Sequence, residues 1–136
     1  MYVAVLERHQ DLVDELIGEV EGYKPDVDRE LLTRAFDFAA RAHDGQLRRS
    51  GQEFIYHPWG AAKILAGLEL DEATLAAALL HDTVEDTVAT LPEIENRFGA
   101  NVARLVDGVT KLSQFELKVR DQRKGNQHDQ YRRHGG

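Results

Sequence analysis

Residues 71–87 read Asp-Glu-Ala-Thr-Leu-Ala-Ala-Ala-Leu-Leu-His-Asp-Thr-Val-Glu-Asp-Thr, and this segment is the most informative part of the chain. It begins with a helix-capping aspartate and continues as a nearly pure core segment of alanines and leucines. Residues three and four positions apart share one face of an α-helix, so we expect His81 to face Glu85. By the same spacing Asp82 faces Glu85 and Asp86. The stretch therefore predicts a core helix that could hold a divalent cation, with a proton acceptor beside it, at its carboxyl end.

Helical periodicity continues on both sides of this stretch. The segment 44–57 contains two glycines and an arginine pair and is expected to be a loop, and no segment has a convincing strand pattern. The expected fold class is therefore all-α. Besides the helix that starts after Asp71, the predicted helices cover residues 8–21, 28–42, 58–68, 90–99 and 101–112.

A second histidine, His57, lies 24 positions before His81, at the start of the preceding predicted helix. An antiparallel pair of helices could bring these two imidazoles together. Spacing alone leaves two interpretations open, a metal site or a buried histidine with an ordinary hydrogen bond. His43 lies on the apolar face of its helix, and a structural role is expected for it.

Charge and composition exclude several classes of protein. The chain has 136 residues, no cysteine and a net charge of −7, of which residues 1–117 carry −11 and residues 118–136 carry +4. An acidic body argues against nucleic acid as a partner, and no apolar segment is long enough to cross a membrane. We expect a cytoplasmic protein with one domain over residues 1–117 and a polar, basic, disordered tail over 118–136.

Several motifs resemble, in order and spacing, the N-terminal hydrolase domain of the RelA/SpoT homologue family. The first is Ala-His-Asp-Gly-Gln-Leu-Arg-Arg-Ser-Gly-Gln-Glu-Phe-Ile-Tyr-His-Pro over residues 42–58. The others are Ala-Ala-Leu-Leu-His-Asp-Thr-Val-Glu-Asp-Thr over 77–87, Phe-Gly over 98–99 and Val-Asp-Gly-Val-Thr-Lys-Leu over 106–112. The resemblance runs from about residue 24 to about residue 117 and implies the helical fold of HD phosphohydrolases.

The resemblance also implies an activity and a set of site residues. The activity is manganese-dependent hydrolysis of the alarmones ppGpp and pppGpp (guanosine tetra- and pentaphosphate) at the 3′-pyrophosphate. At matching positions, His57, His81 and Asp82 are metal ligands, and Glu85 and Asp86 are the acidic pair that activates water. The nucleotide-binding loop matches Arg48, Arg49 and Ser50, although the family more often has lysine at the position of Arg49. Imidazole and carboxylate ligands suit manganese, with iron or zinc as alternatives.

The sequence departs from the family in one respect. The family's fourth metal ligand is an aspartate in a Lys-Leu-Ala-Asp-Arg-like motif, and that motif is absent from the 136 residues. We therefore expect a domain incomplete at its C-terminal end, with helix faces that could form a homodimer. Two alternatives to the alarmone hydrolase stay open. One is a non-catalytic helical module that binds a metal or a nucleotide, and the other is an HD phosphohydrolase for another nucleotide.

Overall fold

A computed structural model describes residues 8–111 of the chain. Over this range the regular structure is helical, and the only β-type pairing is an isolated bridge between Leu47 and Glu53. The all-α fold class is confirmed. The helices are α2 (Gln10–Glu21), α3 (Arg29–Ala42), α4 (Tyr56–Gly67), α5 (Glu72–Asp86) and α6 (Leu91–Phe98), and residues 100–111 are also helical.

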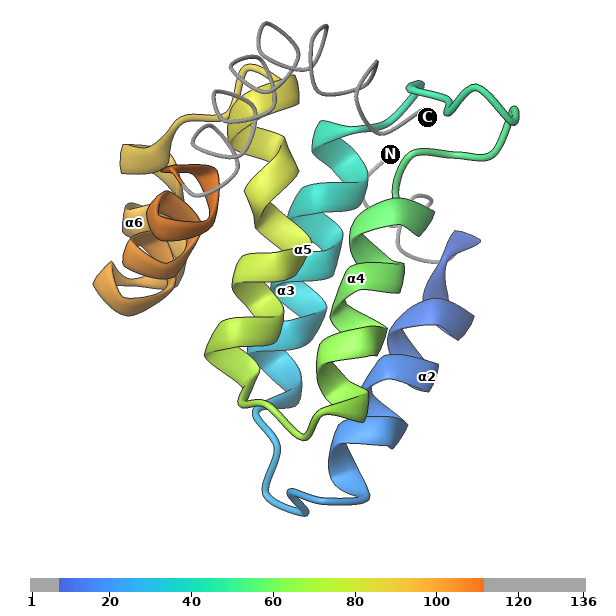
Figure 1. The fold of residues 1–136 in the computed structure, drawn as a ribbon, viewed down its shortest axis with the longest axis vertical. Coiled ribbons are helices and arrows are strands. Elements are labelled where there is room, and N and C mark those ends of the chain that lie inside the picture. Colours follow the sequence, from blue (N-terminus) through green and yellow to red (C-terminus); the bar gives the residue numbers. More distant parts are fainter. Residues whose placement is uncertain (1–7, 112–136) are drawn as a thin grey trace, which may run out of the picture.

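Helix α5 lies at the centre of the described fold, where α3 and α4 both pack against it and α2 packs against α3 and α4 (Figure 1). Its leucines Leu75, Leu79 and Leu80 are completely buried, as is Phe36 on α3. The all-apolar stretch read in the sequence is buried because neighbours cover α5 on more than one side. Buried ionisable groups of α5 lie at its two ends, Glu72 in the first turn and Asp82 near the carboxyl end.

Side-chain caps fix where three helices begin. The carboxylate of Asp28 accepts a hydrogen bond from Leu31 N at the start of α3, and that of Asp71 accepts from Thr74 N at the start of α5. The Thr90 hydroxyl accepts from Glu93 N at the start of α6. Each cap satisfies a backbone N–H that the first helical turn leaves unpaired. The predicted starts of these helices are confirmed.

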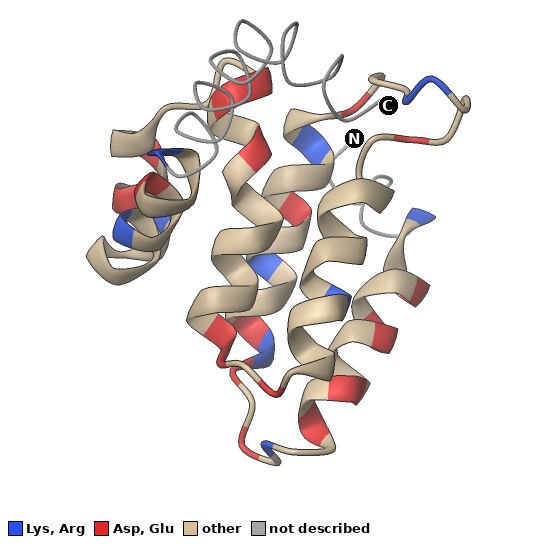
Figure 2. Cartoon of the chain, viewed as in Figure 1, with Lys and Arg blue, Asp and Glu red and all other residues tan. Residues whose placement is uncertain are grey.

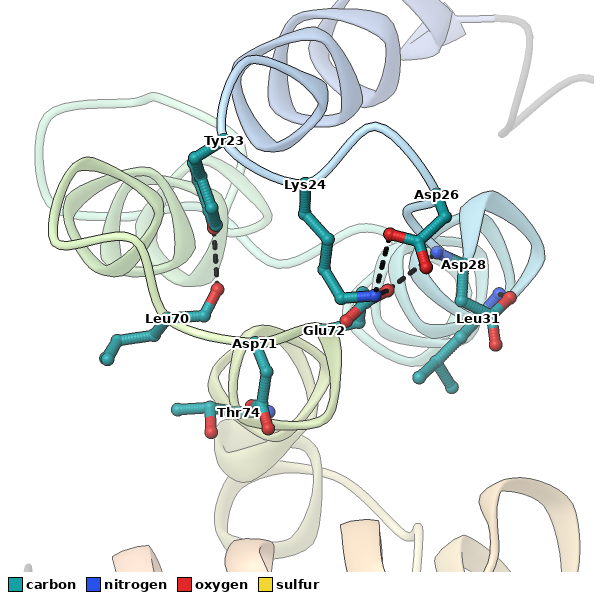
Figure 3. Close-up of polar contacts among 9 residues, drawn as sticks. All are labelled: Tyr23, Lys24, Asp26, Asp28, Leu31, Leu70, Asp71, Glu72 and Thr74. Carbon is teal, nitrogen blue, oxygen red and sulfur yellow. Dashed lines mark hydrogen bonds and ion pairs between the residues drawn. The ribbon is translucent and has the colours of Figure 1, made fainter.

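A cluster of polar contacts joins the α2–α3 and α4–α5 connections at the amino-terminal end of α5 (Figure 3). The Tyr23 hydroxyl donates to the Leu70 carbonyl at 2.6 Å, and Asp28 N donates to the Glu72 carboxylate at 2.8 Å. Lys24 Nζ lies 3.2 Å from the same Glu72 carboxylate. About ten residues of helix, roughly 15 Å, separate Glu72 from Asp82. These contacts therefore fix the end of α5 away from its histidine and aspartates.

The predicted loop over residues 44–57 is wrong at its end, because α4 begins at Tyr56 rather than at Pro58. Proline is tolerated throughout a first helical turn, where its missing N–H has no intrahelical acceptor. Consequently His57 lies inside the helix. The preceding residues 46–54 fold back on themselves, with Phe54 N donating to the Gln46 carbonyl at 3.1 Å. Gly51, with φ +88°, supplies the left-handed turn.

The tail predicted over residues 118–136, and the end of the domain predicted at residue 117, lie outside the described residues. Among residues 8–111, no helix combines the length and the apolar character that a membrane span needs.

Candidate metal centre

Two helices bring two histidines to one buried aspartate. His81 and Asp82 lie near the carboxyl end of α5, and His57 lies in the first turn of α4. His81 Nε2 is 3.0 Å from Asp82 Oδ1, and His57 Nε2 is 3.6 Å from Asp82 Oδ2. Asp82 is only 8% exposed. One oxygen of the buried Asp82 carboxylate thus faces the imidazole of His81 on α5, and the other faces the imidazole of His57 on α4.

The tautomer of His81 leaves its Nε2 as an acceptor. Nδ1 lies 3.0 Å from the Ala78 carbonyl oxygen, which can only accept a hydrogen bond, so Nδ1 carries a proton. In the neutral ring, the Nε2 lone pair therefore meets an Asp82 oxygen at 3.0 Å, and two acceptors at this distance require a proton or a cation between them. Donation of a ring N–H to a backbone carbonyl is also the usual arrangement of a metal-ligating histidine.

The short contact between His81 and Asp82 shifts the pKa of both side chains. The hydrogen bond with Asp82 raises the pKa of His81 above its usual value and outweighs burial, which acts in the opposite direction. Burial by itself raises the pKa of Asp82, but the hydrogen bond from His81 and the charges of the nearby imidazoles lower it overall. The structure without a cation therefore favours an imidazolium–carboxylate pair, and a cation would take the place of the proton.

Glu85 joins this site one turn later on α5. Within residues 8–111, His81, Asp82 and Glu85 form a group whose ligand atoms lie within 4.8 Å of one another. Glu85 is exposed, so its carboxylate is accessible to water. Asp86 is also exposed and lies outside this group, and its backbone carbonyl accepts a hydrogen bond from Gln46 Nε2 at 3.4 Å.

His43 and Gln46 also lie beside this site. The sequence predicted only a structural role for His43 and no role for Gln46. His43 is 2% exposed and stacks on Phe54, with ring centroids 4.5 Å apart. Because the Gln46 amide nitrogen donates to the Asp86 carbonyl, Gln46 Oε1 is the acceptor for His43 Nδ1–H at 3.1 Å. In the neutral ring, His43 Nε2 is then a lone pair, buried and without a hydrogen-bond partner among the described residues. In the sequence, only the three-residue spacing between His43 and Gln46 indicated that their side chains could meet.

The predicted nucleotide-binding residues Arg48, Arg49 and Ser50 lie at the exposed tip of the fold-back before α4. Arg48 N donates to the Gln52 carbonyl and Gly51 N donates to the Arg48 carbonyl, both at 2.8 Å. Figure 2 shows this basic tip at the upper right, whereas acidic residues mark the carboxyl end of α5. The structure thus brings His57, His81, Asp82 and Glu85 together and places the two arginines on the segment that leads into α4.

Comparison with known proteins identifies the family. A model of the HD domain family matches residues 35–134. The chain is an HD domain. This match extends beyond residue 117, where the resemblance was expected to end, and it includes His57, His81 and Asp82.

Relatives of this HD domain carry names of the RelA/SpoT family. It is 42% identical over 127 residues to a GTP pyrophosphokinase of Myxococcus xanthus, covering 93% of this chain and 16% of that protein. It is 48% identical over 103 residues to the GTP pyrophosphokinase rsh of Brucella ovis, covering 76% and 14%. It is 46% identical over 112 residues to the bifunctional (p)ppGpp synthase/hydrolase SpoT of Escherichia coli, covering 82% and 16%. The chain thus corresponds to the HD region of the RelA/SpoT homologue family and spans about one sixth of these relatives.

The donor set of this HD domain fits a divalent cation. Imidazole nitrogens and a carboxylate suit manganese, iron or zinc. Asp82 Oδ2 is buried and without a hydrogen-bond partner among the described residues, although His57 Nε2 is near it. A buried acceptor of this kind is costly unless a donor or a cation satisfies it. His57, His81 and Asp82 are therefore the residues that could hold the ion.

Proposed function

We propose that this HD domain hydrolyses guanosine tetra- and pentaphosphate at the 3′-pyrophosphate and depends on Mn²⁺. The observation that carries the proposal is the convergence of His57 and His81, from α4 and α5, on the two oxygens of Asp82. The names of the relatives, which include a (p)ppGpp synthase/hydrolase, support this class of substrate.

Each predicted residue has a role that its position supports. His57, His81 and Asp82 would hold the cation, which supplies a Lewis acid for the phosphate and makes water more acidic. Glu85 is exposed within 4.8 Å of the His81 and Asp82 donors, and it accepts a proton from the attacking water. Asp86 is the second, exposed carboxylate of the acidic pair.

Electrostatics explains why both a cation and the arginines are needed. The carboxyl end of α5 presents Asp82, Glu85 and Asp86, and it would repel a polyphosphate on its own. Arg48 and Arg49 offer guanidinium groups that can bind phosphate oxygens in pairs or stack on a base. Together with the Ser50 hydroxyl, they bind the nucleotide on the side of the site from which α4 begins.

An assay of pyrophosphate release tests the proposal. The full chain is incubated with guanosine tetraphosphate and Mn²⁺, and the variants His81→Ala and Asp82→Asn are expected to lose at least about a hundredfold in rate, as for loss of a metal ligand or its main partner. Asp14→Asn is the matched control, because Asp14 is exposed on α2 and bonds only to the nearby Gln10 side chain in the described contacts. Unchanged turnover in His81→Ala would reject the assignment.

Binding measurements and a panel of nucleotides, added to this assay, separate the two alternatives. One alternative is a helical module that binds a metal or a nucleotide without turnover. Binding of Mn²⁺ and nucleotide with no pyrophosphate release would support that module. Hydrolysis of a different nucleotide in a substrate panel, with guanosine tetraphosphate untouched, would support another HD phosphohydrolase.

A further inference from the structure

Residues 46–54 form a short arginine hairpin, which carries the two exposed arginines at its tip. It contains a single bridge, Leu47 with Glu53, and a few backbone hydrogen bonds. An isolated two-stranded hairpin is marginal in water. Something outside the hairpin must therefore hold it if its arginines are to have a defined position.

The residues immediately before α2 supply that contact. His9 Nε2 lies 2.9 Å from Glu53 Oε2, on the returning arm of the hairpin. Arg8 Nη2 lies 3.2 Å from the same Glu53 oxygen and 3.2 Å from Asp44 Oδ1, which precedes the outgoing arm. Two adjacent residues thus contact the returning arm of the hairpin and the chain just before its outgoing arm, more than thirty positions later in the sequence.

The His9 contact is fixed to the core, whereas the Arg8 contacts are at the surface. His9 is 2% exposed, and its ring lies edge-on to Phe36 at 6.0 Å and to Tyr56 at 6.3 Å. Tyr56 begins α4 and directly precedes His57. The side chains of Arg8 and Glu53 are 49% and 40% exposed, so solvent screens their pairing. The buried imidazole is therefore the member of the pair that sets the geometry.

We propose that Arg8 and His9 are positioning residues that hold the arginine hairpin in place for a phosphorylated nucleotide. This inference rests on the proposed function, because it assumes that Arg48 and Arg49 bind the substrate. A hairpin that is already ordered loses less conformational freedom when the nucleotide binds, so holding it improves affinity without touching the chemistry. The segment before α2 would then act on substrate binding rather than on the metal.

Amide hydrogen exchange tests the anchoring without any substrate. The reporters are the hydrogen-bonded amides of Arg48, Gly51 and Phe54. In Glu53→Gln these amides are expected to exchange about tenfold faster, the change that corresponds to loss of one charge-assisted hydrogen bond. Lys63→Gln is the control, because Lys63 pairs with Glu15 and Glu19 farther along α2. Unchanged exchange in Glu53→Gln would overturn the proposal.

Kinetics tests the positioning role. In Glu53→Gln and Arg8→Gln the KM for guanosine tetraphosphate is expected to rise up to about tenfold, kcat to stay within about twofold and Mn²⁺ affinity to stay unchanged. Arg8 is half exposed, so its variant folds even if a change at His9 disrupts packing. A fall in kcat with KM unchanged would overturn the proposal. If the wild-type chain releases no pyrophosphate, the Kd for the nucleotide replaces KM, and an unchanged Kd with faster exchange would overturn it too.

Discussion

Replacement of Asp82 by asparagine is predicted to change protein stability in opposite directions at low and high pH. Without a cation, the Asp82 carboxylate and the His81 imidazole form a pair at 3.0 Å in which Nδ1–H is already engaged with Ala78. Asp82→Asn keeps the side-chain shape but removes the charge and adds an amide donor. Its effect on the free energy of unfolding therefore depends on whether His81 Nε2 carries a proton.

The sign of the effect follows from the direction of the two pKa shifts. Because the pKa of His81 is raised, the stabilisation is complete below its unfolded value of about 6.5 and is lost as pH rises through the folded value. Because the pKa of Asp82 is lowered, its contribution is present above its unfolded value of about 3.9 and is lost as pH falls through the folded value. Between these unfolded values the pair is fully charged.

The expected magnitudes follow from the hydrogen bonds. At about pH 5.5 the variant loses a charge-assisted bond in a mostly buried pair and should be less stable by about 1.5–3 kcal/mol. Above the folded pKa of His81, the wild-type carboxylate faces a lone pair, whereas the asparagine amide can donate to Nε2. There the variant should be more stable by about 1 kcal/mol.

Urea unfolding in the presence of a chelator, from about pH 5 to about pH 9, measures both values. Asp14→Asn should stay within about 0.5 kcal/mol of wild type throughout, because its carboxylate is exposed. A difference between Asp82→Asn and wild type that does not vary with pH would refute the reasoning. Addition of Mn²⁺ at about one hundred times its Kd should stabilise the wild type by about 2.7 kcal/mol and the variant by much less.

Three further predictions concern the stability of the fold and its association with a second copy. Phe36→Ala removes a completely buried ring and should destabilise the fold by about 3–5 kcal/mol in chemical denaturation, with a smaller loss indicating that the site collapses. Asp71→Ala removes the cap on Thr74 N and should lower the stability of the fold by about 0.5–2 kcal/mol, whereas an unchanged value would show that water replaces the cap. Ile64 on α4 and Leu68 at its carboxyl cap are 69% and 66% exposed, so if this face forms a homodimer, Ile64→Glu should convert a dimer to a monomer in light scattering. A monomeric wild type at working concentration would count against that dimer.

Much of the fold could be predicted from the sequence because its determinants act over one or two helical turns. A capping aspartate and the run of alanines and leucines specify α5 wherever it lies. The same local rule places His81, Asp82 and Glu85 on one face, since residues three and four apart are neighbours in any α-helix. The resemblance to the RelA/SpoT homologue family followed from motifs whose spacing is likewise written in the chain.

Tertiary packing alone decided which distant residues meet. The approach of His57 to Asp82 depends on how α4 packs against α5, and no periodicity specifies that angle or that distance. The anchoring of Glu53 by His9 likewise joins side chains that lie 44 positions apart in the sequence. Local propensity sets the backbone of each segment, whereas the burial of shared apolar surface sets how the segments combine, and here that burial brings the polar ends of α4 and α5 together.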